Sequence, residues 1–273
     1  MMISKSEMEA LLDQILDSKK YRGLGLNRDT IQDLIAQEAR HHASPKKLKK
    51  SVRRKLHNIV APYLGEPDYQ TLKKDLHQMT PIHPDSPQVK AFCKSILSAH
   101  ASTQERIPIM DQFYDRLFEH TGKPEILLDL ACGLHPFAFP WMGLPSSVQY
   151  HAYDIIQPRI DFINAFFSQI GLQPLAENRD ILVHPPAIEA GLALIFKEAH
   201  RMEKRQPGCN KALWESLKVK TLAVSLPTQN LAGTHSLIEQ HRDLVYRNLP
   251  QNRCVEELEF EDEIVFLISK SGR

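Results

Sequence analysis

The sequence predicts an α/β protein in which a doubly wound, largely parallel sheet follows an all-α region. Three observations predict this class. From residue 123 onward, short apolar runs alternate with helical patterns, as in a parallel sheet that helices cover on both faces. Before about residue 105, apolar residues recur only at helical spacing. The last two apolar runs are joined by the acidic turn 260–263, which is too short for a crossover helix and implies an antiparallel hairpin.

Seven strands fit the alternating part of the chain, and a helix around 236–248 separates the fifth strand from the sixth. A doubly wound sheet that closes with an antiparallel hairpin is typical of the Rossmann-like (class I) methyltransferases that use S-adenosylmethionine (SAM). The expected strands are Glu125–Leu130, Val148–Tyr153, Leu175–Asp180, Leu192–Phe196, Leu222–Leu226, Cys254–Glu259 and Ile264–Ser269.

The N-terminal region is expected to form helices. The first follows a capping box formed by Ser6 and Glu9, and the second begins near 27–29. The third is the clearest, because Ser44 provides an N-cap and Pro45 stands at the first helical position.

A less regular segment, 65–88, connects these helices to the rest of the chain and contains one short helix at 69–79. A regular helix follows at 89–100. Pro108 conflicts with a helix that runs unbroken from Ser102, so we expect a kink there or a later start.

Charge divides the chain into two parts. The 273 residues carry 34 Lys+Arg and 33 Asp+Glu, and this balance with 42% hydrophobic residues excludes a disordered chain or a polyelectrolyte. However, residues 1–105 hold 17 basic and 12 acidic residues, whereas residues 106–273 hold 17 and 21. We therefore expect a docking domain at 1–105 and a SAM-dependent methyltransferase domain at 106–273.

The excess positive charge is concentrated in Arg40–His57, which holds eight cationic side chains, three histidines and no acid. A solvated charged surface is the common explanation for such a helix face. However, these cations repel one another and the segment holds no acid to offset them, so we favour a polyanionic partner, a nucleic acid. The predicted RNA-binding residues lie outside the apolar stripe of the third helix: Lys46, Lys47, Lys49, Lys50, Arg53, Arg54 and Lys55.

Cysteine spacing and hydropathy exclude other classes. The four cysteines lie far apart without a C-x-x-C pair, so we expect neither disulfides nor a metal site. No stretch approaches the roughly 18 apolar residues of a membrane span, and the first twenty residues lack the apolar core of a signal peptide. A cytoplasmic protein without a membrane partner is expected.

Acidic residues end three consecutive predicted strands, where α/β sheets bind ligands. The first strand ends in Asp129 and is followed by Gly133, a pair that an ordinary turn also explains. The single glycine argues against NAD or FAD, which need a glycine-rich turn for their pyrophosphate. Asp154, 21 residues after Gly133, can accept the ribose hydroxyls of an adenosine cofactor, while Asp180 and Ile181 can hold adenine. The pattern predicts a SAM pocket.

Seven segments in order resemble the aminoglycoside-resistance 16S ribosomal RNA methyltransferases of the Arm/Rmt type, which methylate N7 of a decoding-site guanine. The most specific are HASTxER and DxACGxxP. The matching segments are SKKYR (18–22), RHHASPKKLKKSVRRKLH (40–57), SAHASTQER (98–106), LLDLACGLHPFA (127–138), YDI (153–155), RDILVHPPAIEAGLALIFK (179–197) and VSLPT (224–228).

This resemblance implies that the helical region docks on 16S rRNA within the 30S subunit and that the enzyme confers resistance to gentamicin- and kanamycin-type drugs. It also implies that Arg106 pairs with the methionine carboxylate of SAM, a geometry that guanidinium suits. The implied SAM contacts are Tyr63, His100, Ala101, Ser102, Arg106, Ala131, Asp154, Asp180, Ile181 and Phe196.

The chain departs from the family at two places where the guanine should be held. The family's SFPTRSLGGR becomes the segment 225–234, without either arginine, and its GxNP becomes Gly133-Leu134-His135-Pro136. Two alternatives therefore stay open: methylation of another rRNA position, and a non-catalytic ribosome-binding relative that keeps the fold.

Guanine N7 has a lone pair and no proton, so the transfer needs positioning and no general base, and we expect no catalytic acid or base. The guanine must leave its stack, because the A-form major groove is narrow. Phe137 or Phe139 could contact the base, although core packing is the commoner role of phenylalanine. At the rim, where plain loop chemistry is the alternative, the expected base contacts are His135, Lys197 and Thr228.

Overall fold

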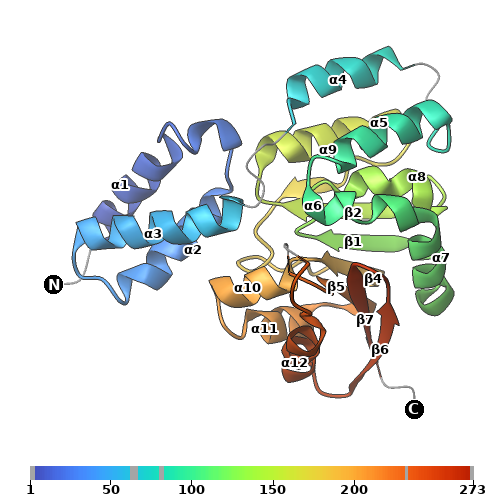
Figure 1. The fold of residues 1–273 in the computed structure, drawn as a ribbon. Coiled ribbons are helices and arrows are strands. Elements are labelled where there is room, and N and C mark those ends of the chain that lie inside the picture. The colour runs from blue at the N-terminus through green and yellow to red at the C-terminus, as the bar shows by residue number, and fades with distance from the viewer. Residues whose placement is uncertain (1–3, 62–66, 80–82, 231–232, 271–273) are drawn as a thin grey trace.

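The computed structural model describes residues 4–61, 67–79, 83–230 and 233–270. A seven-stranded sheet forms its centre, in the order β3-β2-β1-β4-β5-β7-β6 (Figure 1). The first five strands are parallel, and β7 is antiparallel to both β5 and β6, which confirms the predicted sheet and closing hairpin. The strands are β1 Ile126–Leu130, β2 Gln149–Asp154, β3 Ala176–Asn178, β4 Ala190–Phe196, β5 Val219–Pro227, β6 Arg253–Glu259 and β7 Glu263–Lys270.

Helices precede the sheet and connect its strands. The α-helices are α1 Lys5–Leu16, α2 Arg28–Ala39, α3 Pro45–Val60, α4 Tyr69–Gln78, α5 Pro87–Leu97, α6 Ala101–Gln104, α7 Met110–Thr121, α8 Phe139–Met142, α9 Gln157–Gln169, α10 Ala199–Arg205, α11 Cys209–Ser216 and α12 Ile238–Asn248. Short 3₁₀ turns are η1 Arg22–Leu24, η3 Ile107–Ile109 and η4 His135–Ala138. Within the described residues, no helix is both long and apolar enough to cross a membrane.

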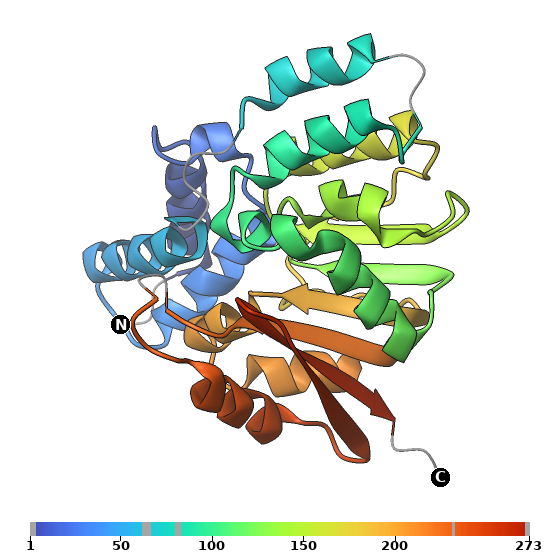
Figure 2. The same cartoon turned by 45° about the vertical axis from the view of Figure 1, so that its right-hand side comes forward.

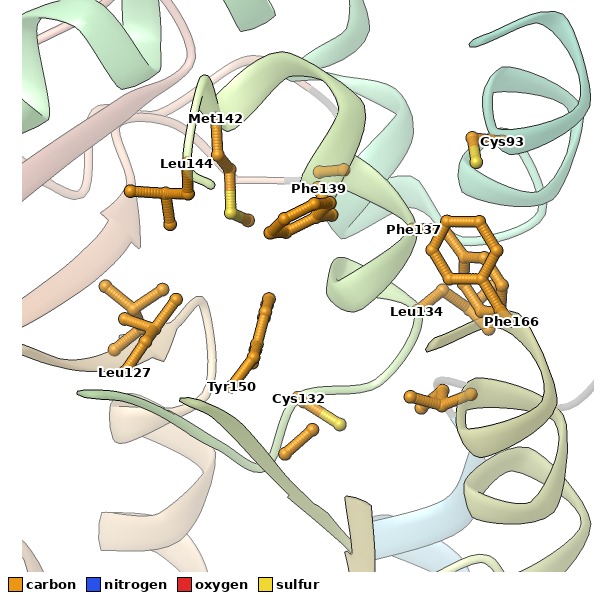
Figure 3. Close-up of a cluster of buried hydrophobic side chains, with 14 of the residues drawn as sticks. Cys93, Leu127, Cys132, Leu134, Phe137, Phe139, Met142, Leu144, Tyr150 and Phe166 are labelled. Carbon is orange, nitrogen blue, oxygen red and sulfur yellow. The ribbon is translucent and has the colours of Figure 1, made fainter. Parts of the chain in front are cut away.

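Helices cover both faces of the sheet (Figures 1 and 2). Helices α4, α5, α7, α8 and α9 share one buried apolar cluster with one face, while α10, α11 and α12 share a second cluster with the other. Figure 3 shows part of the first cluster, in which Phe137 and Phe139 lie among apolar side chains. The Phe137 ring centroid lies 4.9 Å from that of Phe162. Both phenylalanines therefore pack in the core and do not contact a base.

Helices α1, α2 and α3 form a separate unit, the helical unit, with a core of its own. Its buried residues include Leu34, Val52 and Leu56, and Ile156 is the buried residue that the sheet domain adds to it. Helices α4 and α5 instead bury their apolar residues against the sheet. The buried residues of α4 and α5 therefore belong to a different cluster from those of α1, α2 and α3, while the domain boundary at residue 105 stays a prediction.

Local details differ from the predicted elements at three places. The capping box of α1 joins Ser4 and Glu7, two residues earlier than predicted. The helix predicted from Ser102 breaks into α6, the 3₁₀ turn η3 and α7, as the position of Pro108 requires. Strand β3 ends at Asn178, so Asp180 lies in the turn after the strand.

Candidate active site

The sequence-predicted cofactor residues meet at the carboxyl ends of the strands, beside the point where strand order reverses between β1 and β4. Ala131 and Gly133 adopt left-handed backbone conformations, each with φ of 55°. A Cβ atom on Gly133 would meet nothing within 4 Å, so this turn faces open space. A cavity here is lined by Ser102, Arg106, Asp129, Ala131, Gly133 and Phe196, together with His135.

The enclosed part of the cavity is small, about 20 Å³, and the Gly133 turn beside it is open. The chemistry of the lining nevertheless fits an adenosine cofactor. An open glycine turn and an acidic strand end stand where such cofactors bind in α/β sheets. A carboxylate offers about four acceptor positions, so the protein contacts described below leave capacity for a ligand.

Asp154 connects the first two strand ends. Its Oδ2 accepts a hydrogen bond from the Gly133 amide at 3.1 Å and pairs with Arg159 Nη1 at 2.6 Å. Its Oδ1 accepts from the amide of Ile156 at 3.0 Å. Arg159, on α9, is buried with only 2% of its surface exposed. This arginine was not identified from the sequence, because a single arginine in an apolar helix carries no motif.

His135, which the sequence predicts to contact the base, uses both of its ring nitrogens within the protein. Its Nδ1 donates to Asp129 Oδ2 and its Nε2 accepts from the Tyr114 hydroxyl, both at 2.7 Å. The Tyr150 hydroxyl donates to the same Asp129 oxygen at 2.7 Å. All four side chains are buried, so both ring nitrogens of His135 are used within the protein. The geometry makes His135 a support for Asp129 beneath the cavity.

Arg106 lines the cavity, but its bidentate partner in this structure is Glu263, at 2.6 Å from both Nε and Nη2. The predicted partner was the cofactor's carboxylate. The guanidinium carbon lies 4.4 Å and 4.5 Å from the ring centroids of Phe113 and Phe196. Burial alone would raise the pKa of Glu263, yet Arg106 lowers it by stabilising the carboxylate. This pair fixes the guanidinium between two rings at the cavity wall.

Asp180 and Ile181 are buried in the turn after β3. Asp180 Oδ2 pairs with Arg205 Nη2 at 2.7 Å, and Oδ1 accepts from the amide of Leu182 at 3.0 Å. The amides of Val183 and His184 donate to the Asp180 carbonyl and close the turn. Arg205, whose side chain is 9% exposed, is a second arginine that was not identified from the sequence.

The two rim residues are also bonded within the protein. Lys197, with φ of 55°, places its ammonium on Glu105. The Thr228 hydroxyl donates to the carbonyl of Glu261 at 2.9 Å. Thr228 also lines a second cavity, of about 260 Å³, beside the loop that differs from the family. Both side chains are therefore oriented by contacts within the protein in this structure.

The remaining predicted cofactor residues have different positions. His100 is buried at the start of α6, Ser102 lines the cavity, and Ala101 is exposed. Tyr63 lies outside the described residues. Within the described ranges, no group of three or more His, Cys, Asp or Glu side chains is arranged to hold a metal ion.

Helix α3 carries the predicted RNA-binding residues on the surface of the helical unit. Lys49 donates to Gln14 at 2.9 Å, and Lys55 pairs with the buried Glu38 at 2.7 Å. The other five are exposed, and among the described residues none of them forms an ion pair: Lys46, Lys47, Lys50, Arg53 and Arg54. We call these five the α3 cation surface. Lys20 was not assigned from the sequence and lies outside α3, but its Nζ is 2.9 Å from Nδ1 of His57, which is on α3.

Comparisons with known proteins agree with this geometry. Residues 17–265 match the family model described as "Ribosomal RNA methyltransferase (FmrO)". The chain is 33% identical over 267 residues to a 16S rRNA (guanine(1405)-N(7))-methyltransferase of Serratia marcescens, covering 96% of this chain and 98% of that protein. It is 29% identical over 225 residues to a protein of the same name from Micromonospora rosea, covering 81% and 82%.

Two solved structures are similar over nearly their whole length. The 16S rRNA methylase RmtB is 31% identical with a TM-score of 0.79, covering 96% of this chain and 98% of that one. The 16S rRNA methyltransferase RmtF, in complex with S-adenosyl-L-homocysteine (SAH), is 26% identical with a TM-score of 0.78, covering 98% and 100%. The family model spans most of the chain and one relative is 33% identical over 96% of it, so this protein belongs to the ribosomal RNA methyltransferase (FmrO) family.

Proposed function

We propose that this protein transfers the methyl group of SAM to N7 of guanine 1405 in 16S rRNA, the reaction for which its curated relatives are named. The observation that carries the proposal is the cavity between the ends of β1 and β4, where residues far apart in sequence form one lining. The substrate is further proposed to be the 30S subunit, and the expected consequence is resistance to gentamicin- and kanamycin-type aminoglycosides.

The pocket residues have distinct proposed roles toward SAM, which supplies a methyl group activated by a sulfonium. Gly133 and Ala131 let the cofactor approach the backbone after β1. Asp154 accepts the ribose hydroxyls, while Asp180 and Ile181 hold the adenine. Phe196 forms a wall that Arg106 and His135 hold in place, with ring centroids of Phe196 and His135 4.8 Å apart.

No side chain is assigned to remove a proton, because N7 attacks through its own lone pair. The protein's contribution is to align the guanine with the sulfonium and to exclude water. The flipped base has a proposed place in the second cavity. Pro227 on β5 lies next to Thr228 of the second cavity and pairs with Glu263 on β7. Glu263 binds Arg106, which lines the first cavity. The two cavities are therefore neighbours at the carboxyl ends of the parallel strands.

The α3 cation surface is proposed to bind rRNA phosphates. These five exposed cations, which have no acidic partner in the described part of the chain, repel one another, and a polyanion relieves this repulsion with release of its counterions. The apolar side of α3 packs in the core of the helical unit, so the cations on its other sides keep the spacing of the helix.

The direct test is incorporation of tritium from methyl-labelled SAM into purified 30S subunits, followed by mass mapping of the labelled nucleotide. Label at N7 of guanine 1405 is expected. Label elsewhere would assign another rRNA target, and subunit binding without label would indicate the non-catalytic alternative. In a susceptible bacterium, expression should protect against gentamicin-type drugs and leave sensitivity to apramycin-type drugs unchanged.

A further inference from the structure

One largely buried arginine connects the helical unit to the carboxyl ends of the parallel strands, which we call the cofactor edge of the sheet. Arg205, the last residue of α10, places Nη2 at 2.7 Å from Asp180 Oδ2 and at 3.2 Å from Asp33 Oδ2. Asp180 lies in the turn that is proposed to hold adenine, whereas Asp33 lies on α2 of the helical unit. Figures 1 and 2 show α10 beside this unit. A single guanidinium therefore serves two carboxylates from different parts of the molecule.

Arg205 is the cation that compensates the buried carboxylate of Asp180. Asp180 is 2% exposed, and within the described ranges no other cationic side chain pairs with it. Burial alone would lower the pKa of Arg205, yet the pKa is raised because Asp180 and Asp33 both stabilise the cation. Arg205 thus supplies the charge that compensates Asp180, while the amide of Leu182 holds the other carboxylate oxygen.

Asp33 is held by further contacts across the same boundary. Gln37 Nε2 donates to Asp33 Oδ2 and to Gln206 Oε1, both at 2.8 Å. At the start of α2, Asn27 donates through its side chain to Asn178 Oδ1 at 2.7 Å. Helix α2 is therefore hydrogen-bonded near both of its ends to residues of the sheet domain.

Helix α2 is also connected to the RNA-facing side of the helical unit. It shares the unit's apolar core with α3, and its Glu38 pairs with Lys55 of that helix. The shared core and this ion pair therefore join α3 directly to the helix that carries Asp33.

We propose that Arg205 is a positioning residue that couples docking of the helical unit on rRNA to cofactor binding at Asp180. The proposal deepens the function proposed above and rests on it. Docking that stabilises α2 in its observed place keeps Arg205 on Asp180 and so tightens cofactor binding. By thermodynamic reciprocity, bound cofactor strengthens docking by the same factor.

The first test measures SAH binding to the free protein by calorimetry in a double-mutant cycle. Asp33→Asn should weaken SAH binding by about threefold to tenfold, although Asp33 is not proposed to touch the cofactor. Arg205→Met should weaken it by at least roughly tenfold, because Asp180 loses its counter-charge. The double variant should resemble Arg205→Met alone, since Asp33 acts only through Arg205.

The matched control is Asp13→Asn, which breaks an exposed pair with Arg28 at 3.1 Å inside the helical unit. It should leave SAH binding unchanged. Thermal melting checks that each variant folds, and Arg205→Lys, which keeps the charge, should restore part of the affinity. Wild-type affinity in Asp33→Asn, or fully additive effects in the double variant, would overturn the proposal.

The second test measures SAH affinity in the presence of saturating 30S subunits. The wild-type protein should bind SAH at least about threefold more tightly when docked, and Asp33→Asn should lose this gain. An equal gain in both proteins contradicts the coupling. Failure of either protein to bind subunits would instead count against the proposed function, while the cycle on the free protein still decides the role of Arg205.

Discussion

The α3 cation surface and the cofactor edge use charge in opposite ways. On α3, five cations are exposed and unpaired within the described structure. At the cofactor edge, Arg106, Arg159 and Arg205 are each buried or nearly so and pair with a carboxylate. Exposed charges bind a polyanion over long range and in a salt-dependent way, whereas buried pairs hold side chains in fixed orientations. Basic side chains thus attract a polyanion in one region and hold carboxylates in place in the other.

Charge reversal on α3 should give the largest effect. Replacing Lys46, Lys47, Lys49 and Lys50 by glutamate should weaken 30S binding by at least about a hundredfold, because fewer counterions are released when fewer phosphates are neutralised. SAH affinity should stay at the wild-type value. Filter binding at several salt concentrations, with calorimetry for SAH, measures both.

A control for net charge places glutamate at four lysines that are exposed on the sheet domain: Lys211, Lys218, Lys220 and Lys270. This variant should retain most of the subunit binding. Unchanged binding by the α3 variant would show that its charges serve only solubility.

Asp154→Ala should weaken SAH binding by roughly 1.5–3 kcal/mol, the usual cost of lost charged hydrogen bonds. It should also lower the free energy of unfolding by about 3 kcal/mol, because the buried ion pair between Asp154 and Arg159 is lost. Calorimetry and chemical denaturation measure the two effects. Asp161→Ala, at an exposed position on α9, should change neither, and wild-type SAH affinity in Asp154→Ala would remove the ribose role.

His135 offers a test of positioning without direct contact. His135→Leu should lower the free energy of unfolding by about 1–3 kcal/mol, because Asp129 and the Tyr114 hydroxyl each lose a buried partner. His135→Asn, the family's residue here, should lose less, since an amide can still donate to Asp129. Urea denaturation compares the variants, and equal losses for Leu and Asn would contradict the hydrogen-bonding role.

The smallest expected effect concerns pH. Burial lowers the pKa of His200 to about 3, and nearby Arg201, His241 and Lys204 add to this by repelling the imidazolium. Below pH 6.5 the unfolded chain binds a proton that the folded protein does not, so stability is lost as pH falls from 6.5 toward 3. The slope should approach about 1 kcal/mol per pH unit between pH 6 and 5.

The comparison variant is His200→Asn, whose free energy of unfolding should fall less steeply over the same pH interval. Denaturation curves at pH 6.5, 6.0, 5.5 and 5.0 measure the difference in slope. Parallel pH profiles for the two proteins would show that His200 does not contribute.

Sequence patterns of short range predicted much of the fold. Alternating apolar runs located all seven strands, and the acidic turn before Glu263 correctly indicated the antiparallel hairpin. Pro45 and the apolar stripe predicted α3, because a proline start and a 3.6-residue period are local properties of a helix. The predicted end of the third strand was less accurate. Asp180 was expected to end the strand, whereas β3 ends at Asn178 and Asp180 lies in the turn that follows.

The sequence by itself determined the order of the strands along the chain, the cationic helix and the loops that carry Asp129, Asp154 and Asp180. Only the tertiary structure decided which side chains these carboxylates meet and that α4 and α5 belong to the sheet. Arg106 and Glu263 are 157 positions apart, and Arg205 and Asp33 are 172 apart. Periodicity and turn residues act over a few neighbours, whereas such pairs form only when the strands and the helical unit have packed.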